Sequence, residues 1–194
     1  IQQGTMQRFQ LRTRYAYSSL NHLYNLPDAY LELRQEGSTE WKRIDTKSDE
    51  NGLLSVYFGT PGTWYVRIAK PYPSGTTLSK AAQVIRYETV VHVEACPQNP
   101  VETTFCVTMQ GEDVTNTAQI TVTDADGTVM QDTGTAGSYA LIPGIYTYEI
   151  TASDTNGTFT QHGSFYVLNG GDPVTITEEL KESLYLRELS IAKM

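Results

Sequence analysis

One short segment occurs twice in this chain and limits the folds that the chain can adopt. Pro61-Gly62-Thr63-Trp64-Tyr65-Val66-Arg67-Ile68 returns 82 residues later as Pro143-Gly144-Ile145-Tyr146-Thr147-Tyr148-Glu149-Ile150. Each copy begins with a Pro-Gly turn and continues with large side chains at alternate positions, which is the pattern of a half-buried β-strand. A recurrence at this distance predicts two structural units of similar size.

The alternation also predicts which side chains of the two copies are buried. Successive residues of a strand point to opposite faces, so every second residue shares a face. The large side chains on one face are Trp64, Val66, Ile68, Tyr146, Tyr148 and Ile150. We expect this face to lie in the core of each unit, with Trp64 and Tyr146 as equivalent buried anchors.

Two further pairs of segments match between the halves. Residues 30–33 match residues 119–122, and residues 91–93 match residues 174–176. Asn-Gly or Asp-Gly turns, which supply positive φ cheaply, lie at residues 49–52, 124–127 and 154–157. Many short strands separated by such turns predict an all-β fold of two β-sandwich modules in tandem.

The boundary between the modules is predicted at residues 95–100, Ala-Cys-Pro-Gln-Asn-Pro. Two prolines in four residues oppose both a helix and a paired strand, and they make a short, stiff connection. We therefore expect a first module at 1–95 and a second at 96–180. Residues 181–194 fit neither period cleanly and are either a tail or the start of a further module.

The turn and strand motifs resemble those of a known family. Residues 46–52 followed by 61–66, and Asp126-Gly127 followed by Pro143-Gly144 and Tyr146, are similar to the Cna-B, or prealbumin-like, repeats of bacterial surface proteins and pilins. The resemblance implies immunoglobulin-like (prealbumin-like) sandwiches at the extracellular surface of a bacterial cell. It also implies neighbouring domains of the same polypeptide as partners, and it covers most of both modules.

One property of that family is not expected here. Its pilin domains often carry an isopeptide bond between a Lys of the first strand and an Asn of the last. Neither predicted first strand, residues 8–17 or 101–109, contains Lys, and neither predicted last strand, residues 89–94 or 174–180, contains Asn. Arginine cannot replace the lysine, because its guanidinium is too basic and delocalised to act as the amine nucleophile.

The charge of the chain argues against two classes of partner. The formal net charge is −8 and the pI is about 4.8, so phosphate backbones and anionic lipid surfaces are poor partners. No apolar run approaches the roughly 18 residues that a membrane helix needs, so we predict no membrane insertion in this segment.

No catalytic or cofactor-binding pattern is present in the sequence. His22, His92 and His162 are far apart and fit no metal-ligand spacing, and no serine lies in a G-x-S-x-G elbow. The Asp-rich turns are expected to be ordinary β-turns, with calcium as an open alternative. We predict a non-enzymatic protein with no cofactor and no metal.

Aromatic residues and the two cysteines are the remaining candidates for sites. Trp41 and Tyr72 lie in loop-like stretches of the first module, where exposed rings could form a platform for a carbohydrate ligand. Cys96 and Cys106 could close a short disulfide loop or could remain thiols.

Three classes of function remain open after these observations. A structural or adhesive spacer of an exported bacterial surface protein fits the tandem modules best. A carbohydrate- or protein-binding accessory module of an extracellular enzyme, with a host or cell-surface glycan or protein as partner, is the alternative. An enzyme in its own right fits least, because the sequence contains no recognisable set of nucleophile, base or metal ligands.

Overall fold

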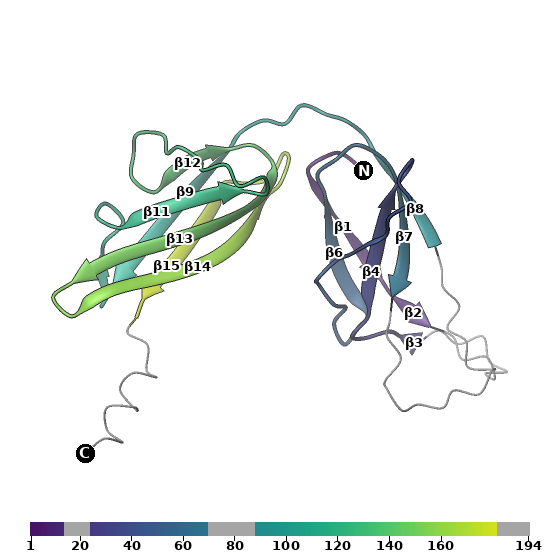
Figure 1. Ribbon diagram of the computed structural model, residues 1–194, viewed down its shortest axis with the longest axis horizontal. Coiled ribbons are helices and arrows are strands. Elements are labelled where there is room, and N and C mark those ends of the chain that lie inside the picture. Colours follow the sequence, from purple (N-terminus) through teal and green to yellow (C-terminus); the bar gives the residue numbers. More distant parts are fainter. Residues whose placement is uncertain (14–23, 70–87, 182–194) are drawn as a thin grey trace, which may run out of the picture. The chain divides into compact units, whose positions relative to one another are not determined.

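The structure of the chain, a computed structural model, describes residues 1–13, 24–69 and 88–181. The chain divides into unit 1, Ile1–Pro97, and unit 2, Gln98–Met194. This division lies within residues 95–100, where the prolines predict a boundary. Figure 1 shows the strands of each unit, which are described separately below.

The described residues form strands, turns and loops, and they contain no helix, so the prediction of an all-β fold is confirmed. Unit 1 contains β1 (Thr5–Gln10), β2 (Arg12–Thr13), β3 (Tyr24–Asn25), β4 (Tyr30–Gln35), β5 (Lys42–Arg43), β6 (Leu53–Phe58), β7 (Gly62–Ala69) and β8 (Glu88–Val93). Unit 2 contains β9 (Val101–Met109), β10 (Glu112–Asp113), β11 (Gln119–Asp124), β12 (Ser138–Leu141), β13 (Gly144–Asp154), β14 (Gly157–Val167) and β15 (Val174–Leu180).

Unit 2 is a sandwich of two sheets. In one sheet β9 pairs with β10, β12 and β15, and in the other β13 pairs with β11 and β14. Alternate residues of β9 point into the core, where Phe105 makes edge contacts with Tyr139 and Tyr148 at centroid distances of 5.8 and 5.4 Å. Both sheets contribute buried residues to this one core, as expected for a sandwich.

Unit 1 has its own core. One sheet has the order β5-β4-β7-β8, and β1 pairs with β6 in another. Leu31 and Leu33 of β4 and Val66 and Ile68 of β7 are buried against side chains of the β1–β6 pair, including the fully buried Phe58. The inward residues that the period-two pattern predicts for β4 and β7 are therefore the ones that form the core.

The two Pro-Gly strands, β7 and β13, hold the same position in their sheets. β7 lies between β4 and β8, and β13 lies between β11 and β14. Leu31 is opposite Ile68 and Ile120 is opposite Ile150, so the matched segments 30–33 and 119–122 pair with their Pro-Gly strands in the same register.

The predicted match between residues 91–93 and 174–176 is wrong. β8 pairs antiparallel with the Pro-Gly strand β7, whereas β15 pairs parallel with β9, the first strand of unit 2. The strand that occupies the place of β8 in unit 2 is β14, which pairs antiparallel with β13. The error arises because short Val- and Thr-rich strands share one local pattern, and that pattern does not specify the pairing partner.

The prediction that Trp64 is buried like Tyr146 is also wrong in part. Tyr146 is 3% exposed and stacks on Phe165 at a centroid distance of 5.6 Å, whereas Trp64 is half-buried and forms a T-shaped pair with Phe58 at 5.9 Å. Trp64 faces the core, as its position in the alternating pattern of the strand predicts, but it lies close to the start of β7, at the margin of the core.

Candidate functional surfaces

The outward face of the β5-β4-β7-β8 sheet carries a dense set of cationic and aromatic side chains. Because β4 and β7 bury their alternate residues, the residues between them point away from the core. We call the resulting surface the basic-aromatic face. It consists of Tyr30, Glu32, Arg34, Trp41, Arg43, Lys47, Tyr65 and Arg67.

A row of alternating charges crosses this sheet. Arg43 of β5 is opposite Glu32 of β4, which is opposite Arg67 of β7, which is opposite Glu88 of β8. The Nε of Arg67 donates to Oε2 of Glu32 at 2.7 Å, and a nitrogen of Arg43 lies 3.7 Å from the other carboxylate oxygen. Glu32 therefore holds two arginines from neighbouring strands.

Aromatic rings fix the cations of this face further. The guanidinium carbon of Arg67 lies 4.1 Å from the Trp41 ring centroid, and that of Arg34 lies 4.4 Å from the Tyr65 centroid and 5.2 Å from the Trp41 centroid. Arg43 and Lys47 lie 5.2 and 5.4 Å from the centroid of Tyr30. These separations are those of cation–π contacts.

The predicted platform residue Trp41 thus lies on the basic-aromatic face, and its ring contacts guanidinium groups. A neutral sugar would have to compete with Arg67 and Arg34 for that ring, so Trp41 alone does not form an open stacking platform. Tyr72 and His22 lie outside the described residues. Arg34 and Arg67 are not among the site residues predicted from the sequence, although the period-two pattern already places both on the outward faces of their strands.

In unit 2, Tyr148 is the side chain whose ionisation the fold changes most clearly. Its hydroxyl donates a hydrogen bond to the carboxylate of Glu178 on β15. Burial of the phenol raises the pKa of Tyr148 to about 12, and the hydrogen bond to Glu178 and the charge of that carboxylate act in the same direction. Gly163, opposite Tyr148 on β14, leaves the space that the Tyr148 ring occupies.

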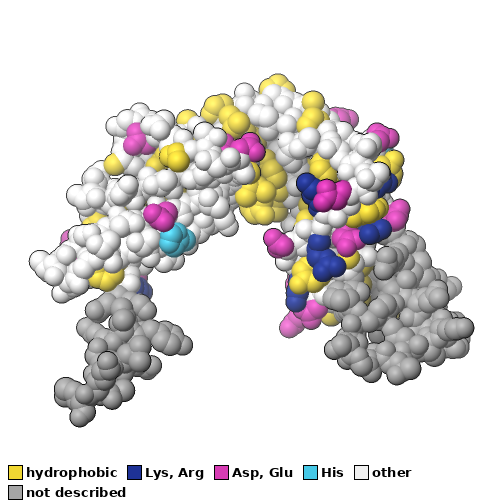
Figure 2. Space-filling model, in the orientation of Figure 1, with side chains coloured by type: hydrophobic (Ala, Val, Ile, Leu, Met, Phe, Trp, Pro, Cys, Tyr) yellow, Lys and Arg dark blue, Asp and Glu magenta, His cyan; other side chains and the backbone are white. Residues whose placement is uncertain are grey.

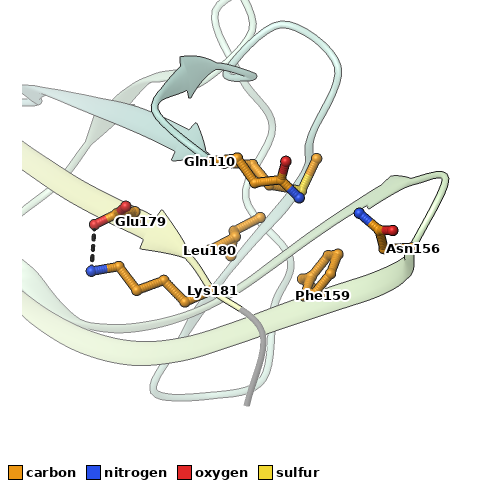
Figure 3. A pocket seen from close by; sticks show the side chains of 7 residues that line it. Gln110, Asn156, Phe159, Glu179, Leu180 and Lys181 are labelled. Atoms are coloured by element: carbon orange, nitrogen blue, oxygen red, sulfur yellow. Dashed lines mark ion pairs between the residues drawn. The ribbon is translucent and has the colours of Figure 1, made fainter. Parts of the chain in front are cut away.

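A pocket of about 530 Å³ lies at one end of unit 2 (Figure 3). Its lining includes the apolar side chains of Met109, Phe159 and Leu180, with polar side chains around them. Lys181 and Glu179 form an ion pair at 2.7 Å within the lining. The ion pair is solvent-exposed, so it contributes little to stability.

The Asp-rich turns use their carboxylates on their own backbone. Oδ1 of Asp49 and Oδ1 of Asp124 each accept hydrogen bonds from the amides two and four residues later. Oδ1 of Asp154 accepts from the amides two and three residues later. This is Asx-turn chemistry. In the described part of the chain, no group of three His, Cys, Asp or Glu residues is arranged to hold a metal ion.

The remaining predicted sites are separate side chains. Cys96 and Cys106 are not joined in a disulfide, and Sγ of Cys96 lies 3.4 Å from the carbonyl oxygen of Gln3, to which it donates. His92 and His162 are exposed on different units. Among residues 1–13, 24–69 and 88–181, no helix has the length and apolar character needed to cross a bilayer.

The chain was compared with known proteins. No protein-family model matches it, and no curated protein matches it. Among solved structures, the Bacillus anthracis TIE protein is 20% identical, with a TM-score of 0.29 over 81% of this chain and 31% of the TIE chain. GBS52, the minor pilin of Streptococcus agalactiae, is 13% identical, with a TM-score of 0.33 over 84% of this chain and 86% of the pilin. The chain therefore spans about a third of the TIE protein, and its function has to be argued from its own residues.

Proposed function

We propose that this chain is a non-catalytic spacer segment of an exported bacterial surface protein, built to carry tension between its ends. The observation that carries the proposal is the parallel pairing of β9 with β15 in unit 2. The export and the bacterial surface rest on the resemblance of the Pro-Gly strands and Asp-rich turns to Cna-B repeats.

The first and last strands of unit 2 run side by side in the same direction. Seven residue pairs join them, from Val174 opposite Thr103 to Leu180 opposite Met109. The chain enters at the start of β9 and leaves at the end of β15, so its two ends lie at opposite ends of the ladder. Tension on the chain pulls the strands in opposite directions along their axes. The backbone hydrogen bonds of the ladder then resist together, rather than one after another.

Unit 1 has a shorter version of the same contact. Gln2 and Glu94 form a parallel bridge, in which the amide of Gln3 donates to the carbonyl of Glu94 and the amide of Glu94 donates to the carbonyl of Ile1, at 2.9 and 2.8 Å. With the bond from the amine of Ile1 to the carbonyl of His92, at 2.9 Å, three bonds share the tension here, over a shorter contact than the seven residue pairs of unit 2. We therefore expect unit 1 to unfold at a lower force than unit 2.

Separate cores support a spacer role as well. The core of unit 1 is built around Leu31, Phe58 and Val66, and that of unit 2 around Phe105, Ile150 and Val167. Units with their own cores can unfold and refold one at a time under tension, which a spacer requires.

Force spectroscopy with two attachment geometries tests the proposal. Handles are attached through cysteines placed at Glu102 and Glu179, at opposite ends of the β9–β15 ladder, or at Glu102 and Thr175, at the same end. All three side chains are exposed. Cys96 and Cys106 are replaced by Ser in both variants so that the handles attach only at the new cysteines. The first geometry shears the ladder and the second peels it.

We expect the shearing geometry to need a several-fold higher force than the peeling geometry. A similar force in both would show that the ladder does not resist tension, and the spacer proposal would then lose its main support. Pulling the whole chain from its ends should give two unfolding events, with unit 1 first.

A second candidate function is that of a binding module, and the basic-aromatic face of unit 1 supports it. A spacer can carry such a surface without losing its mechanical role, so the two functions are compatible on one chain.

A further inference from the structure

The charges of this acidic chain are divided unevenly between its units. Unit 1 carries 11 Lys and Arg against 9 Asp and Glu, a net charge of +2, and unit 2 carries 3 against 13, a net charge of −10. In Figure 2 the Lys and Arg side chains, in dark blue, gather on unit 1. The basic-aromatic face holds Arg34, Arg43, Lys47 and Arg67, so its local charge is opposite to that of the whole protein.

The cations of this face are held in place before any ligand arrives. Stacking uses the flat side of a guanidinium, so its N–H donors, which lie in the plane of the group, remain directed away from the ring. Arg34 is fixed additionally by a bond from its Nη1 to the carbonyl of Ser38 at 2.9 Å, and Arg67 by Glu32. A ligand that binds here loses less free energy to the ordering of side chains.

The composition of the face favours a polymer over a protein partner. Protein interfaces have an apolar centre that is enriched in aromatic residues and Arg and depleted of Lys, Asp and Glu, so a carboxylate such as Glu32 at the centre is unusual for them. Here the centre of the sheet is the charged row of Arg43, Glu32 and Arg67, and the rings of Tyr30 and Trp41 contact cations. Binding to such a surface is driven by charge.

The spacing of the cations indicates how densely a matching ligand is charged. Arg43 and Arg67 lie two strands apart, which is about 10 Å, with Glu32 between them. Duplex DNA carries one charge per roughly 1.7 Å of its axis, so further phosphates would lie near Glu32 between those that pair with Arg43 and Arg67. A polymer with acid groups on alternate sugars fits this spacing better.

We propose that the basic-aromatic face of unit 1 binds an acidic polysaccharide of low charge density, whose uronic carboxylates pair with Arg43, Lys47 and the edges of Arg34 and Arg67. Carboxylate is the planar group that a guanidinium binds through two parallel hydrogen bonds.

Binding of hyaluronan oligosaccharides, which carry one carboxylate on every second sugar, tests the proposal. The full chain is titrated with the oligosaccharide by calorimetry at low ionic strength and again at rising salt. The test variant carries Arg43→Gln and Lys47→Gln, two side chains at the exposed edge of the face. The matched control carries Arg8→Gln and Arg12→Gln, which removes the same charge from exposed positions on β1 and β2.

We expect the affinity for the oligosaccharide to be about tenfold lower in the test variant than in the wild type. The affinity of the wild type should also decrease more steeply with rising salt than that of the variant. The control should keep wild-type affinity. Equal weakening in both variants would overturn the proposal, because net charge rather than the face would then account for binding. Tighter binding of a DNA duplex or a poly-glutamate peptide than of hyaluronan would overturn the choice of partner. An absence of hyaluronan binding at low salt would overturn the proposal as a whole.

Discussion

The hydroxyl of Tyr146 donates a hydrogen bond to the carbonyl oxygen of Ile142, 2.8 Å away, and so closes the Pro-Gly turn that precedes its own strand. Nε1 of Trp64 makes the same bond to the carbonyl of Thr60, at 3.0 Å. In both units the third residue after the proline returns to the residue before it. The two bonds explain why an aromatic side chain with a polar N–H or O–H follows each Pro-Gly pair.

Tyr146→Ala should unfold unit 2 and leave unit 1 folded. Truncating a buried aromatic typically costs about 3–5 kcal/mol, a large share of the stability of one domain. Both tryptophans, Trp41 and Trp64, belong to unit 1, so tryptophan fluorescence follows that unit and circular dichroism follows both. Thermal melts of the variant by the two methods should separate.

Tyr146→Phe is the control for this experiment. It keeps the ring and removes the hydroxyl that bonds to Ile142, so the loss should be about 1 kcal/mol. A shift of the tryptophan transition in Tyr146→Ala would contradict the independence of the two cores.

Unit 2 should lose stability at high pH through Tyr148. The folded state raises the pKa of this phenol from 10.0 to about 12, so it holds a proton that the unfolded chain has already released. The stability that the raised pKa of Tyr148 adds to unit 2 is fully present below pH 10.0, and it is lost as the pH rises towards about 12. Urea unfolding measures the free energy of unfolding of the wild type and of Tyr148→Phe across this pH range. That free energy should fall further in the wild type than in the variant. Parallel curves for the two proteins would refute the assignment.

Gly163→Ala should destabilise unit 2 because the added methyl group would overlap the Tyr148 ring. Overpacking of this kind costs about 1–3 kcal/mol. In a Tyr148→Ala background the same change should be close to neutral, because the obstructing ring is gone. Free energies of unfolding of the four proteins form a double-mutant cycle, and additive values would rule out this contact as the reason for the glycine.

Thr103→Val should stabilise unit 2. Thr103 is fully buried, and its Oγ1 has no hydrogen-bond partner within the described residues. Val has a similar shape, so the change removes an unsatisfied hydroxyl and should gain about 1 kcal/mol. Thr115→Val is the opposite control, since Oγ1 of Thr115 accepts a bond from the amide of Val107 at 2.9 Å. If both variants lose stability in chemical denaturation, Thr103 has a partner such as a buried water.

Local patterns were enough to predict the Pro-Gly strands, the strands opposite them and most of their buried residues. The alternation of Val66 and Ile68, and of Tyr148 and Ile150, follows from the pleat of a strand and needs no knowledge of neighbours. The pairing of β15 with β9 could not be predicted in this way, because any Val- and Thr-rich strand can pair with several others.

The candidate sites could be predicted only in part for a related reason. Trp41 was chosen as an exposed ring, but Arg34 and Arg67 reach it from two different strands. The bond between Tyr148 and Glu178 likewise joins opposite sheets of unit 2. Contacts of this kind depend on the tertiary arrangement, which the period of a single strand does not contain.

The parallel arrangement of β9 and β15 also determines how such a unit contributes to the reach of a longer polypeptide. The chain leaves unit 2 at the end opposite to its entrance, so the unit displaces the chain by about one strand length, or about 30 Å for the nine residues of β9. Duplication of a unit with this topology would lengthen the polypeptide by a fixed step without reversing its direction. Reach can then evolve by changing the number of units, with each core left as it is.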